Sequence, residues 1–370
     1  MPETKNTTRT FGNIYRLIFK EKQCSRQQIA EQLNLSLPTV TASLNQLIKR
    51  NLIHISGYYE SSGGRKANMY ECVPDARYSV GIDITRNHLS IAIIDLNLNI
   101  IGQLRKRCAF IDSDEYYQNM ASDLENLLQK HNVEQNKILG VGISLPVIIE
   151  TDNKTISYAT VIEVSPNVYQ RISKYISSPY LLFNDANSAG LAESWSHQYD
   201  RPSAYLLLST SVGGAFMFAD SPFNGDNNRA SEFGHMCIVA HGRKCYCGSN
   251  GCLDAYCSSQ VLSDYTNGNL EDFFRELDSG NKRFSLIFDE YLNYLAFAVN
   301  NLRMCYDCDV IIGGTVGSHM ERYIEDLRNK ASHLNPFEKN ANYIRTCHYK
   351  TAASAVGAAI YFINQFLMEL

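Results

Sequence analysis

The sequence lacks the features expected of an exported or membrane-spanning protein. No uncharged apolar run reaches the roughly 18 to 20 residues that a membrane span requires, and no apolar signal core follows Met1. The eleven cysteines also lack the regular spacing of a disulfide framework. We therefore expect thiols or metal ligands in a reducing compartment, and a soluble, cytoplasmic protein.

Low complexity and a strong charge of one sign are absent as well. The composition, 45% hydrophobic and 19% charged, is typical of a globular protein, and 370 residues exceed what one hydrophobic core usually organises. The net charge of -4 is nevertheless uneven, because residues 1–70 carry ten Lys/Arg against four Asp/Glu. This basic N-terminal region agrees with contact to a nucleic acid.

Three helices are predicted within the first fifty residues. Apolar residues between Phe11 and Phe19 recur at helical spacing. The run Ser25-Arg26-Gln27-Gln28 is a capping-box pattern that predicts the start of a second helix. Ser36 can cap a third helix, with Pro38 in its first turn. The third helix is expected to bury four apolar residues: Val40, Leu44, Leu47 and Ile48.

The polar side of the third helix and a basic hairpin indicate DNA binding. Short hydrogen-bonding side chains let a helix enter the major groove and touch base edges. Strands predicted over 52–55 and 69–72 flank a tip in which Arg65 would lie beside a minor groove and Lys66 would meet a phosphate. A three-helix packing module with a solvated hairpin is the alternative, but the complete order favours a winged helix-turn-helix. The predicted DNA-binding residues are Ser36, Thr39, Thr41, Asn45, Arg65 and Lys66.

The most specific pattern in the chain lies between Glu232 and Asp254. Its two parts, residues 232–235 and 245–254, together contain three thiols and one imidazole, the ligand count of a closed, structural zinc site. A chance meeting of four buried residues is less plausible, because this segment is rich in Gly rather than apolar. Cys305 and Cys308 have no such partner set and are predicted to be ordinary core thiols. The predicted zinc ligands are His235, Cys245, Cys247 and Cys252.

This pattern, Glu-x-Gly-His followed by Cys-x-Cys-Gly-x-x-Gly-Cys-Leu and an acid, resembles the signature of the ROK family of repressors, open reading frames and sugar kinases. Segments 140–146, 184–187, 209–214 and 311–314 follow in the family's order, so the resemblance runs from about Tyr78 to the C-terminus. With the predicted winged head, the chain is similar to the repressor branch, which includes xylose and N-acetylglucosamine repressors.

The resemblance implies an α/β architecture in which an N-terminal winged helix-turn-helix domain (1–75) precedes an actin-like (ribonuclease H-like) two-lobed body. The small lobe would span 76–195, with a C-terminal helix (352–370) packing back on it. The large lobe (196–351) would hold the zinc site, and a sugar would bind in the cleft.

By the same resemblance, five residues would hydrogen-bond sugar hydroxyls. Carboxylates and amides suit the paired donors and acceptors of a sugar, and His235 could bind zinc through one nitrogen and a hydroxyl through the other. For a single acid such as Asp185 or Glu232, a helix cap or a surface ion pair is the alternative. The predicted sugar-binding residues are Asn184, Asp185, Glu232, His235 and Asp254.

The segments that would bind ATP depart from the family's kinases. There Asp185 would be the general base, while glycine-rich loops cradle the ATP phosphates. The first loop here is residues 83–88, Asp-Ile-Thr-Arg-Asn-His, and it has no glycine. Ser209-Thr210-Ser211 replaces the glycine-bearing start of the second loop, and Val147 replaces a further glycine. Side chains would fill the space that the backbone must leave for a triphosphate.

We therefore expect no ATP binding and no enzymatic activity, with Asp185 a vestigial base. The favoured hypothesis is a sugar-responsive repressor of carbohydrate-utilisation genes, such as those of xylose metabolism. A homodimer or tetramer would bind a pseudo-palindromic DNA operator. A residual sugar kinase, and a DNA-binding protein whose body only dimerises, are the two alternatives.

Overall fold

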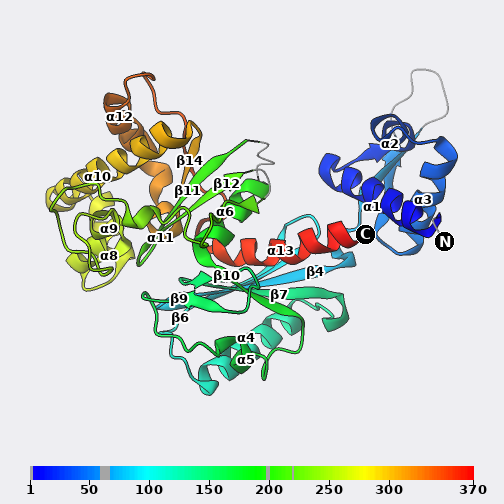
Figure 1. Cartoon of the computed structure of the whole chain (residues 1–370), viewed down its shortest axis with the longest axis horizontal. Coiled ribbons are helices and arrows are strands. Elements are labelled where there is room, and N and C mark those ends of the chain that lie inside the picture. Colours follow the sequence, from blue (N-terminus) through cyan, green and yellow to red (C-terminus); the bar gives the residue numbers. More distant parts are fainter. Residues whose placement is uncertain (1–2, 59–66, 197–200, 219–220) are drawn as a thin grey trace.

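The computed structural model describes residues 3–58, 67–196, 201–218 and 221–370, which form three parts. The N-terminal segment folds into a head at one end of the molecule, and the remainder folds into two lobes, each built on a five-stranded sheet (Figure 1). The order of head, small lobe and large lobe along the chain follows the sequence-based expectation of an α/β body behind a winged helix-turn-helix.

The head contains three helices and a three-stranded sheet of order β1-β3-β2. The predicted capping box is confirmed: the Ser25 hydroxyl accepts from the Gln28 amide, and the Gln28 side chain accepts from the Ser25 amide. Ser36 caps the third helix, where its hydroxyl accepts from the Thr39 amide. The elements are α1 (Glu3–Glu21), β1 (Cys24–Ser25), α2 (Arg26–Leu33), α3 (Leu37–Lys49), β2 (Ile53–Tyr58) and β3 (Asn68–Cys72).

Two burial predictions are wrong, and the predicted DNA-contacting tip falls outside the described residues. Ile48 is 39% exposed because it lies at the edge of the apolar stripe of α3, next to the end of the helix at Lys49. Cys305 is exposed, whereas Cys308 is buried as predicted. Arg65 and Lys66 lie outside the described residues, so the tip between β2 and β3 stays a prediction.

The two lobes share one topology. The first sheet has the order β6-β5-β4-β7-β10 and the second the order β13-β12-β11-β14-β15. In each, three consecutive strands form an antiparallel meander and two later strands add in parallel. The duplication matches the two-lobed, actin-like body that the resemblance implied.

The bounds of the body elements follow the chain. The small lobe contains β4 (Tyr78–Ile84), β5 (His88–Asp95), β6 (Ile100–Arg107), α4 (Asp114–Lys130), β7 (Ile138–Leu145), β8 (Ile148–Ile149), β9 (Ile156–Tyr158), α5 (Val168–Ile172) and β10 (Tyr180–Asn184). The large lobe contains β11 (Ser203–Leu208), β12 (Val212–Phe218), β13 (Ser221–Pro222), α7 (Asp254–Cys257), α8 (Ser259–Ser263), α9 (Leu270–Asp278), α10 (Lys282–Tyr306), β14 (Asp309–Gly313), α11 (Gly314–Gly317), α12 (Ile324–Leu334) and β15 (Ile344–Thr346).

Two helices cross between the lobes. Helix α6 (Asp185–Ser196) follows the first sheet but packs on β11 and β12 of the second. Helix α13 (Ala353–Glu369) follows the second sheet but packs on β4 and β7 of the first, and on α6 (Figure 1). A Cβ atom at Gly81 would lie 1.6 Å from the Ala355 carbonyl oxygen, so glycine is what permits this close approach.

Helix α13 is also, within the described ranges, the one helix long and apolar enough to cross a membrane by length and composition. Its apolar window is 61% buried inside the protein. The helix is therefore accounted for as a core helix, covered by the first sheet on one side and by α6 on another.

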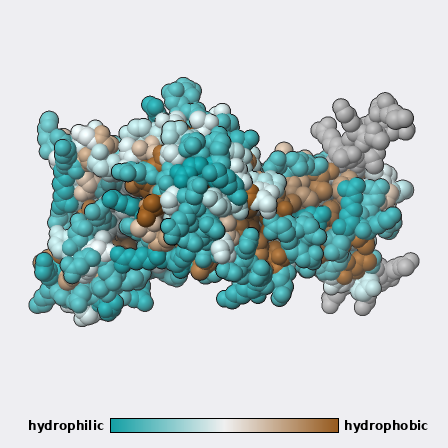
Figure 2. Space-filling view, turned by 90° about the horizontal axis from the view of Figure 1, so that it is seen from below, coloured by the Kyte–Doolittle hydropathy of each residue, from teal (hydrophilic) through white to brown (hydrophobic). Residues whose placement is uncertain are grey.

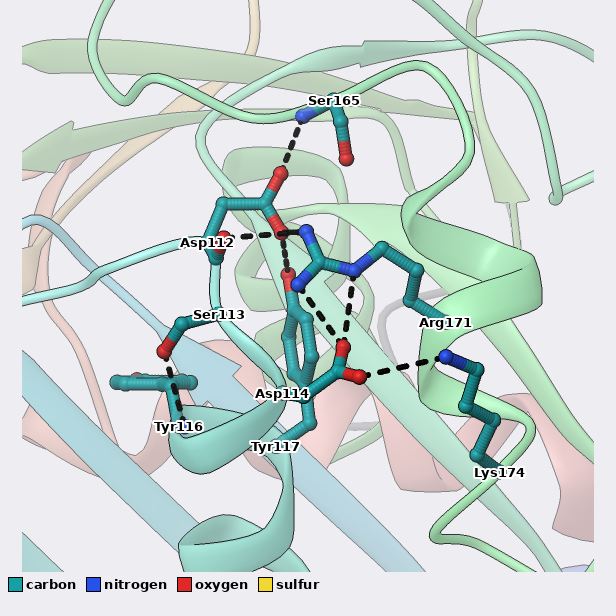
Figure 3. A network of polar contacts seen from close by, with 8 residues as sticks. All are labelled: Asp112, Ser113, Asp114, Tyr116, Tyr117, Ser165, Arg171 and Lys174. Atoms are coloured by element: carbon teal, nitrogen blue, oxygen red, sulfur yellow. Dashed lines mark hydrogen bonds and ion pairs between the residues drawn. The ribbon is translucent and has the colours of Figure 1, made fainter.

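A polar network fastens the segment after β9 to the start of α4 (Figure 3). The Asp112 carboxylate accepts from the Ser165 amide at 2.6 Å and from the Arg171 guanidinium at 2.5 Å. Asp114 pairs with Arg171 at 2.9 Å and with Lys174 at 3.3 Å, and these hydrogen bonds lower the pKa of Asp114. The network thus joins two segments of the small lobe that are about fifty residues apart in the chain.

The head shares a continuous hydrophobic core with the body. The rings of Tyr15 in α1 and Phe366 in α13 meet edge to face with centroids 6.2 Å apart. Phe19 in α1 meets Trp195, near the end of α6, at the same distance. Figure 2 shows hydrophobic residues gathered mainly where the body meets the head, on an otherwise hydrophilic face. Both crossing helices therefore touch the head.

Candidate functional site

The four predicted zinc ligands come together in one cluster. Their ligand atoms all lie within 4.8 Å of one another. The Cys247 and Cys252 sulfurs are 3.8 Å apart, and the Cys245 sulfur lies 3.9 Å from Nδ1 of His235. The cluster joins a short 3-10 turn (Phe233–His235) to the Cys-x-Cys loop.

This spacing fits a tetrahedral metal site. Zn–S bonds of about 2.3 Å at tetrahedral angles place two sulfurs roughly 3.8 Å apart, the separation found between Cys247 and Cys252. Gly248 and Gly251 have φ of 92° and 79°, a conformation that favours glycine and lets the loop turn back on itself. The residues present therefore fit a structural zinc ion.

A cavity of about 350 Å³ opens beside the cluster, between the two lobes. It is lined by four of the five predicted sugar-binding residues: Asn184, Asp185, Glu232 and His235. The small lobe contributes Val147, Ile148, Tyr158 and Thr160, and the large lobe contributes the glycines at the start of β12. Polar groups with a few apolar neighbours in a cavity of this size are typical of a small-molecule site.

Asn184 and Asp185 reach the cavity from the junction of β10 and α6. Oδ1 of Asn184 accepts from the Asn187 amide at 2.9 Å, and its Nδ2 donates to the Val147 carbonyl at 3.0 Å. Oδ1 of Asp185 accepts from the Ala186 amide at 2.8 Å. Both residues thus also stabilise the start of α6. For Asp185 this is the helix-capping role considered above as the alternative to sugar binding.

Asp254 does not line the cavity. Its side chain is buried, and Oδ2 accepts from the Val212 amide at 2.6 Å. Because Val212 itself lines the cavity, this contact fixes the wall rather than offering an oxygen to a ligand. The structure therefore places Asp254 as a positioning residue and does not bring it together with the other four.

The sequence analysis did not single out several lining residues, among them Tyr246 and Arg229. Tyr246, between the paired cysteines, places its hydroxyl 3.4 Å from Nε2 of His235. His235 thus directs one nitrogen toward the thiols and the other toward the cavity side. The position of Tyr246 inside the cysteine motif was a usable signal. Arg229 also lines the cavity, and nothing in its sequence context indicated this.

A second cavity of about 450 Å³ lies on the other side of Asp185. It is lined by Asp83 and by Thr85, Arg86 and His88, which belong to the segment that replaces the glycine-rich loop. Burial, and next the neighbouring Asp83, raises the pKa of Asp185 to about 8. Burial also raises the pKa of Asp83 to about 6, against a hydrogen bond from the Ser144 hydroxyl at 2.7 Å. Asp185 alone of these groups lines both cavities.

The predicted DNA-contacting residues of α3 lie on the outside of the head. Ser36, Thr39 and Asn45 are exposed and Thr41 is half-buried. The Thr41 hydroxyl donates to the Leu37 carbonyl at 2.7 Å. These four residues therefore lie apart from the buried stripe of α3, on the side of the helix that faces outward.

Comparison with known proteins agrees with this geometry. The ROK family model matches residues 79–365, and a winged helix-turn-helix DNA-binding model matches residues 12–54. A putative xylose repressor from a Caldicellulosiruptor species is 24% identical over 342 residues, which span 85% of each protein. The xylose repressor of Bacillus subtilis is 26% identical over 249 residues, 66% of this chain and 64% of that repressor.

Solved structures extend the likeness to the fold. A ROK-family transcriptional regulator, a homologue of the Escherichia coli MLC protein, superposes with a TM-score of 0.73 at 20% identity, over 98% of this chain and 96% of that one. A ROK glucokinase from Streptomyces griseus superposes with a TM-score of 0.64 at 20% identity, over 77% of this chain and 98% of the kinase. The chain therefore belongs to the ROK family, in the branch whose members join a winged helix-turn-helix DNA-binding domain to the family body and act as transcriptional repressors.

Proposed function

We propose that this protein is a cytoplasmic, sugar-responsive repressor that binds an operator through its head and a small sugar in the 350 Å³ cavity. The observation that carries the proposal is the position of α6. This helix begins in the cavity at Asp185 and ends near Trp195, which contacts the head. One rigid element thus joins the ligand site to the DNA-binding domain.

The head supplies the contacts to DNA. Helix α3 would enter the major groove with Ser36, Thr39, Thr41 and Asn45 toward the bases, and Arg65 and Lys66 would meet the minor groove and a phosphate. One head offers few base contacts, so two heads of a homodimer or tetramer would bind the halves of a pseudo-palindromic operator.

The cavity supplies the recognition of the sugar. Asn184, Asp185, Glu232 and His235 would hydrogen-bond hydroxyl groups, and Tyr246 and Arg229 extend this polar wall. Asp254 would hold the Val212 amide in place behind it. A zinc ion held by His235 and the three thiols would have no open position, so it would stabilise this wall and supply no reaction chemistry.

Transmission would use the two crossing helices. A sugar in this cavity would touch both lobes, and its contacts would change as the lobes close. It would favour the degree of closure in which it makes the better contacts. Helices α6 and α13 pack on opposite sheets and on each other, so lobe closure moves one against the other. Both touch α1, so the move would tilt the head. A coupling of about 1–3 kcal/mol would change operator occupancy roughly five- to 150-fold.

The same residues argue against phosphoryl transfer. Asp185 retains the place of a kinase base, but the side chains of Thr85 and Arg86 line the region where the family's kinases bring bare backbone against a triphosphate. We propose that the protein is not an enzyme. ATP-dependent phosphorylation of a sugar at a kinase-like rate would overturn this.

The direct test is selection of bound duplexes from a random DNA pool at fixed salt, followed by titration of the selected site with a panel of free sugars. We expect a palindrome whose binding shifts with one sugar. Asn45→Ala should abolish the enrichment, whereas Lys130→Ala, an exposed charge on α4, should not. A folded, zinc-loaded protein that enriches no sequence would refute the proposal.

A further inference from the structure

The 450 Å³ cavity beyond Asp185 has a chemistry of its own. Its small-lobe wall is formed by the β4–β5 turn and by β6, and its large-lobe wall by Ser209-Thr210 and the segment around Asn269. The sugar and zinc residues other than Asp185 do not line it. Its volume lies within the roughly 300–1,000 Å³ that small-molecule sites occupy.

Three arginines gather on the small-lobe wall. Arg105 and Arg107 are two residues apart on β6, so their side chains lie on one face of the sheet. They stand opposite Ser90 and His88 of β5 in the strand register. Arg86 joins them from the turn, which is tied to the end of β6 because the Arg86 carbonyl accepts from the Phe110 amide at 3.0 Å.

These arginines have no carboxylate partner within 4.0 Å among the described residues. Lys106, between two of them, points to the opposite face and pairs with Asp123 of α4. The nearby positive charges also affect His88. Its pKa is lowered, mainly because the imidazole is partly buried and secondly because Arg105 and Arg107 are charged. The imidazole beside the arginines therefore adds no charge near pH 7, and the positive charge of the wall comes from the three guanidinium groups.

Among the described residues, no acid of the cavity forms an ion pair with this wall within 4.0 Å, although Asp83 and Glu271 lie near enough to favour the charged form of Arg105. Asp83 and Asp185 lie at its inner end, where they meet the sugar cavity. Asp264 and Glu271 stand on the large-lobe side, and Glu271 pairs with His319 at 3.5 Å. A ligand that fits this division carries an anionic group toward the arginines and hydroxyl groups toward the carboxylates.

We propose that this cavity binds a phosphorylated small molecule as a second effector, with Arg86, Arg105 and Arg107 holding its phosphate. A guanidinium presents paired N–H donors that match phosphate oxygens, and a cluster of them binds a phosphate without a glycine-rich loop. The site differs from a kinase nucleotide site because side chains rather than backbone amides hold the anion. A sugar phosphate and a nucleoside monophosphate share this chemistry.

The test is calorimetric titration of the full-length, zinc-loaded protein at fixed ionic strength. The probes are inorganic phosphate, glucose 6-phosphate and AMP, with sulfate-free buffer and sodium chloride as the ionic control. We expect saturable binding of at least one probe. Arg105→Ala and Arg107→Ala should each weaken it about tenfold, because each removes charge-assisted hydrogen bonds to the phosphate.

Lys106→Ala is the matched control, because it removes the same charge from the same strand on the other face. It should change the affinity less than twofold. Binding of glucose 6-phosphate alone would assign the ligand to sugar phosphates, and binding of AMP alone to nucleotides. Circular dichroism and thermal melting verify that each variant is folded. Absence of binding by all three probes, or equal affinity in the Arg105→Ala/Arg107→Ala double variant, would overturn the proposal.

Discussion

The two cavities on either side of Asp185 have diverged in opposite directions. The sugar-side cavity keeps the asparagine, acids and histidine that the family resemblance implies, backed by the metal cluster. The other, where the family's kinases hold ATP, has a loop without glycine and a wall of arginines. In the proposed function, one half of the cleft is a recognition surface, while the other lacks the glycine-rich loop on which phosphoryl transfer by the family's kinases depends.

The contrast teaches which part of the chemistry a regulator retains. Ligand recognition needs hydrogen-bonding groups on a closable cleft, and both lobes still provide them. Transfer also needs a triphosphate held in line with the hydroxyl, which depends on close backbone approach.

Removing the metal cluster should damage the sugar-side cavity most. Cys247→Ser should abolish stoichiometric zinc binding, because three ligands cannot close the tetrahedron. Loss of a structural metal is among the changes that destabilise a protein by about 4 kcal/mol or more. Zinc content, thermal melting and sugar titration measure the effect. Cys237→Ser is the control, since Cys237 is an exposed thiol of the same segment outside the cluster. Equal losses in both variants would contradict a metal role.

Asp185, which lines both cavities, should make the free energy of unfolding depend on pH. An unfolded aspartate titrates near 3.8, whereas the folded-state pKa is raised to about 8. Between these values the folded protein holds the extra proton, so stability falls as pH rises, by at most about 1.4 kcal/mol per pH unit. Asp185→Asn should therefore flatten the fall in melting temperature between pH 5 and 8 and be the more stable protein at pH 8.

The control for this pH effect is Asp114→Asn. Hydrogen bonds from Arg171 and Lys174 lower the pKa of Asp114, so this carboxylate is ionised in both states throughout the window. Its removal should leave the slope between pH 5 and 8 unchanged. An unchanged slope in Asp185→Asn would show that this carboxyl is ionised in the folded protein.

Within the sugar-side cavity, Glu232→Gln should weaken sugar binding about tenfold or more, because a hydrogen bond to a charged acceptor contributes about 1.5–3 kcal/mol. Zinc content and phosphate binding should not change, since Glu232 is neither a cluster member nor a residue of the other cavity. Calorimetry measures both affinities, with Glu115→Gln, an exposed acid of α4, as the matched variant. Unaltered sugar affinity would remove Glu232 from the site.

Much of this contrast could be predicted from the sequence, because it rests on local patterns. The capping box at Ser25 and the ligands from His235 to Cys252 lie close together in the chain, so spacing alone indicates their geometry. The resemblance then predicted which lobe holds which motif. Asp254 fitted the motif but lies behind the cavity wall. This position could not be predicted, because the amide that Asp254 binds belongs to Val212, which is distant in the sequence.

Long-range placement explains what could not be predicted. The arginine wall depends on the register of β5 with β6, which puts His88 opposite Arg107 and leaves Lys106 on the other face. The contact of Phe19 with Trp195 joins residues far apart in the chain. No periodicity within either segment indicates its partner. Such contacts are decided by the packing of the two sheets and the head.

The two cavities share one lining residue and one helix that leads to the head. Asp185 lines both, and α6 leads from it to Trp195, so either ligand would reach the head through this helix. Trp195→Ala should leave sugar affinity within about twofold but reduce the effect of sugar on operator affinity, a loss of at most about 1–3 kcal/mol of coupling. Trp195→Phe, which keeps an aromatic ring against Phe19, should retain most of the response. Fluorescence anisotropy of a labelled operator, with and without saturating ligand, measures the coupling. A full response in Trp195→Ala would place the signal in α13 instead, because that helix reaches α1 independently through Phe366.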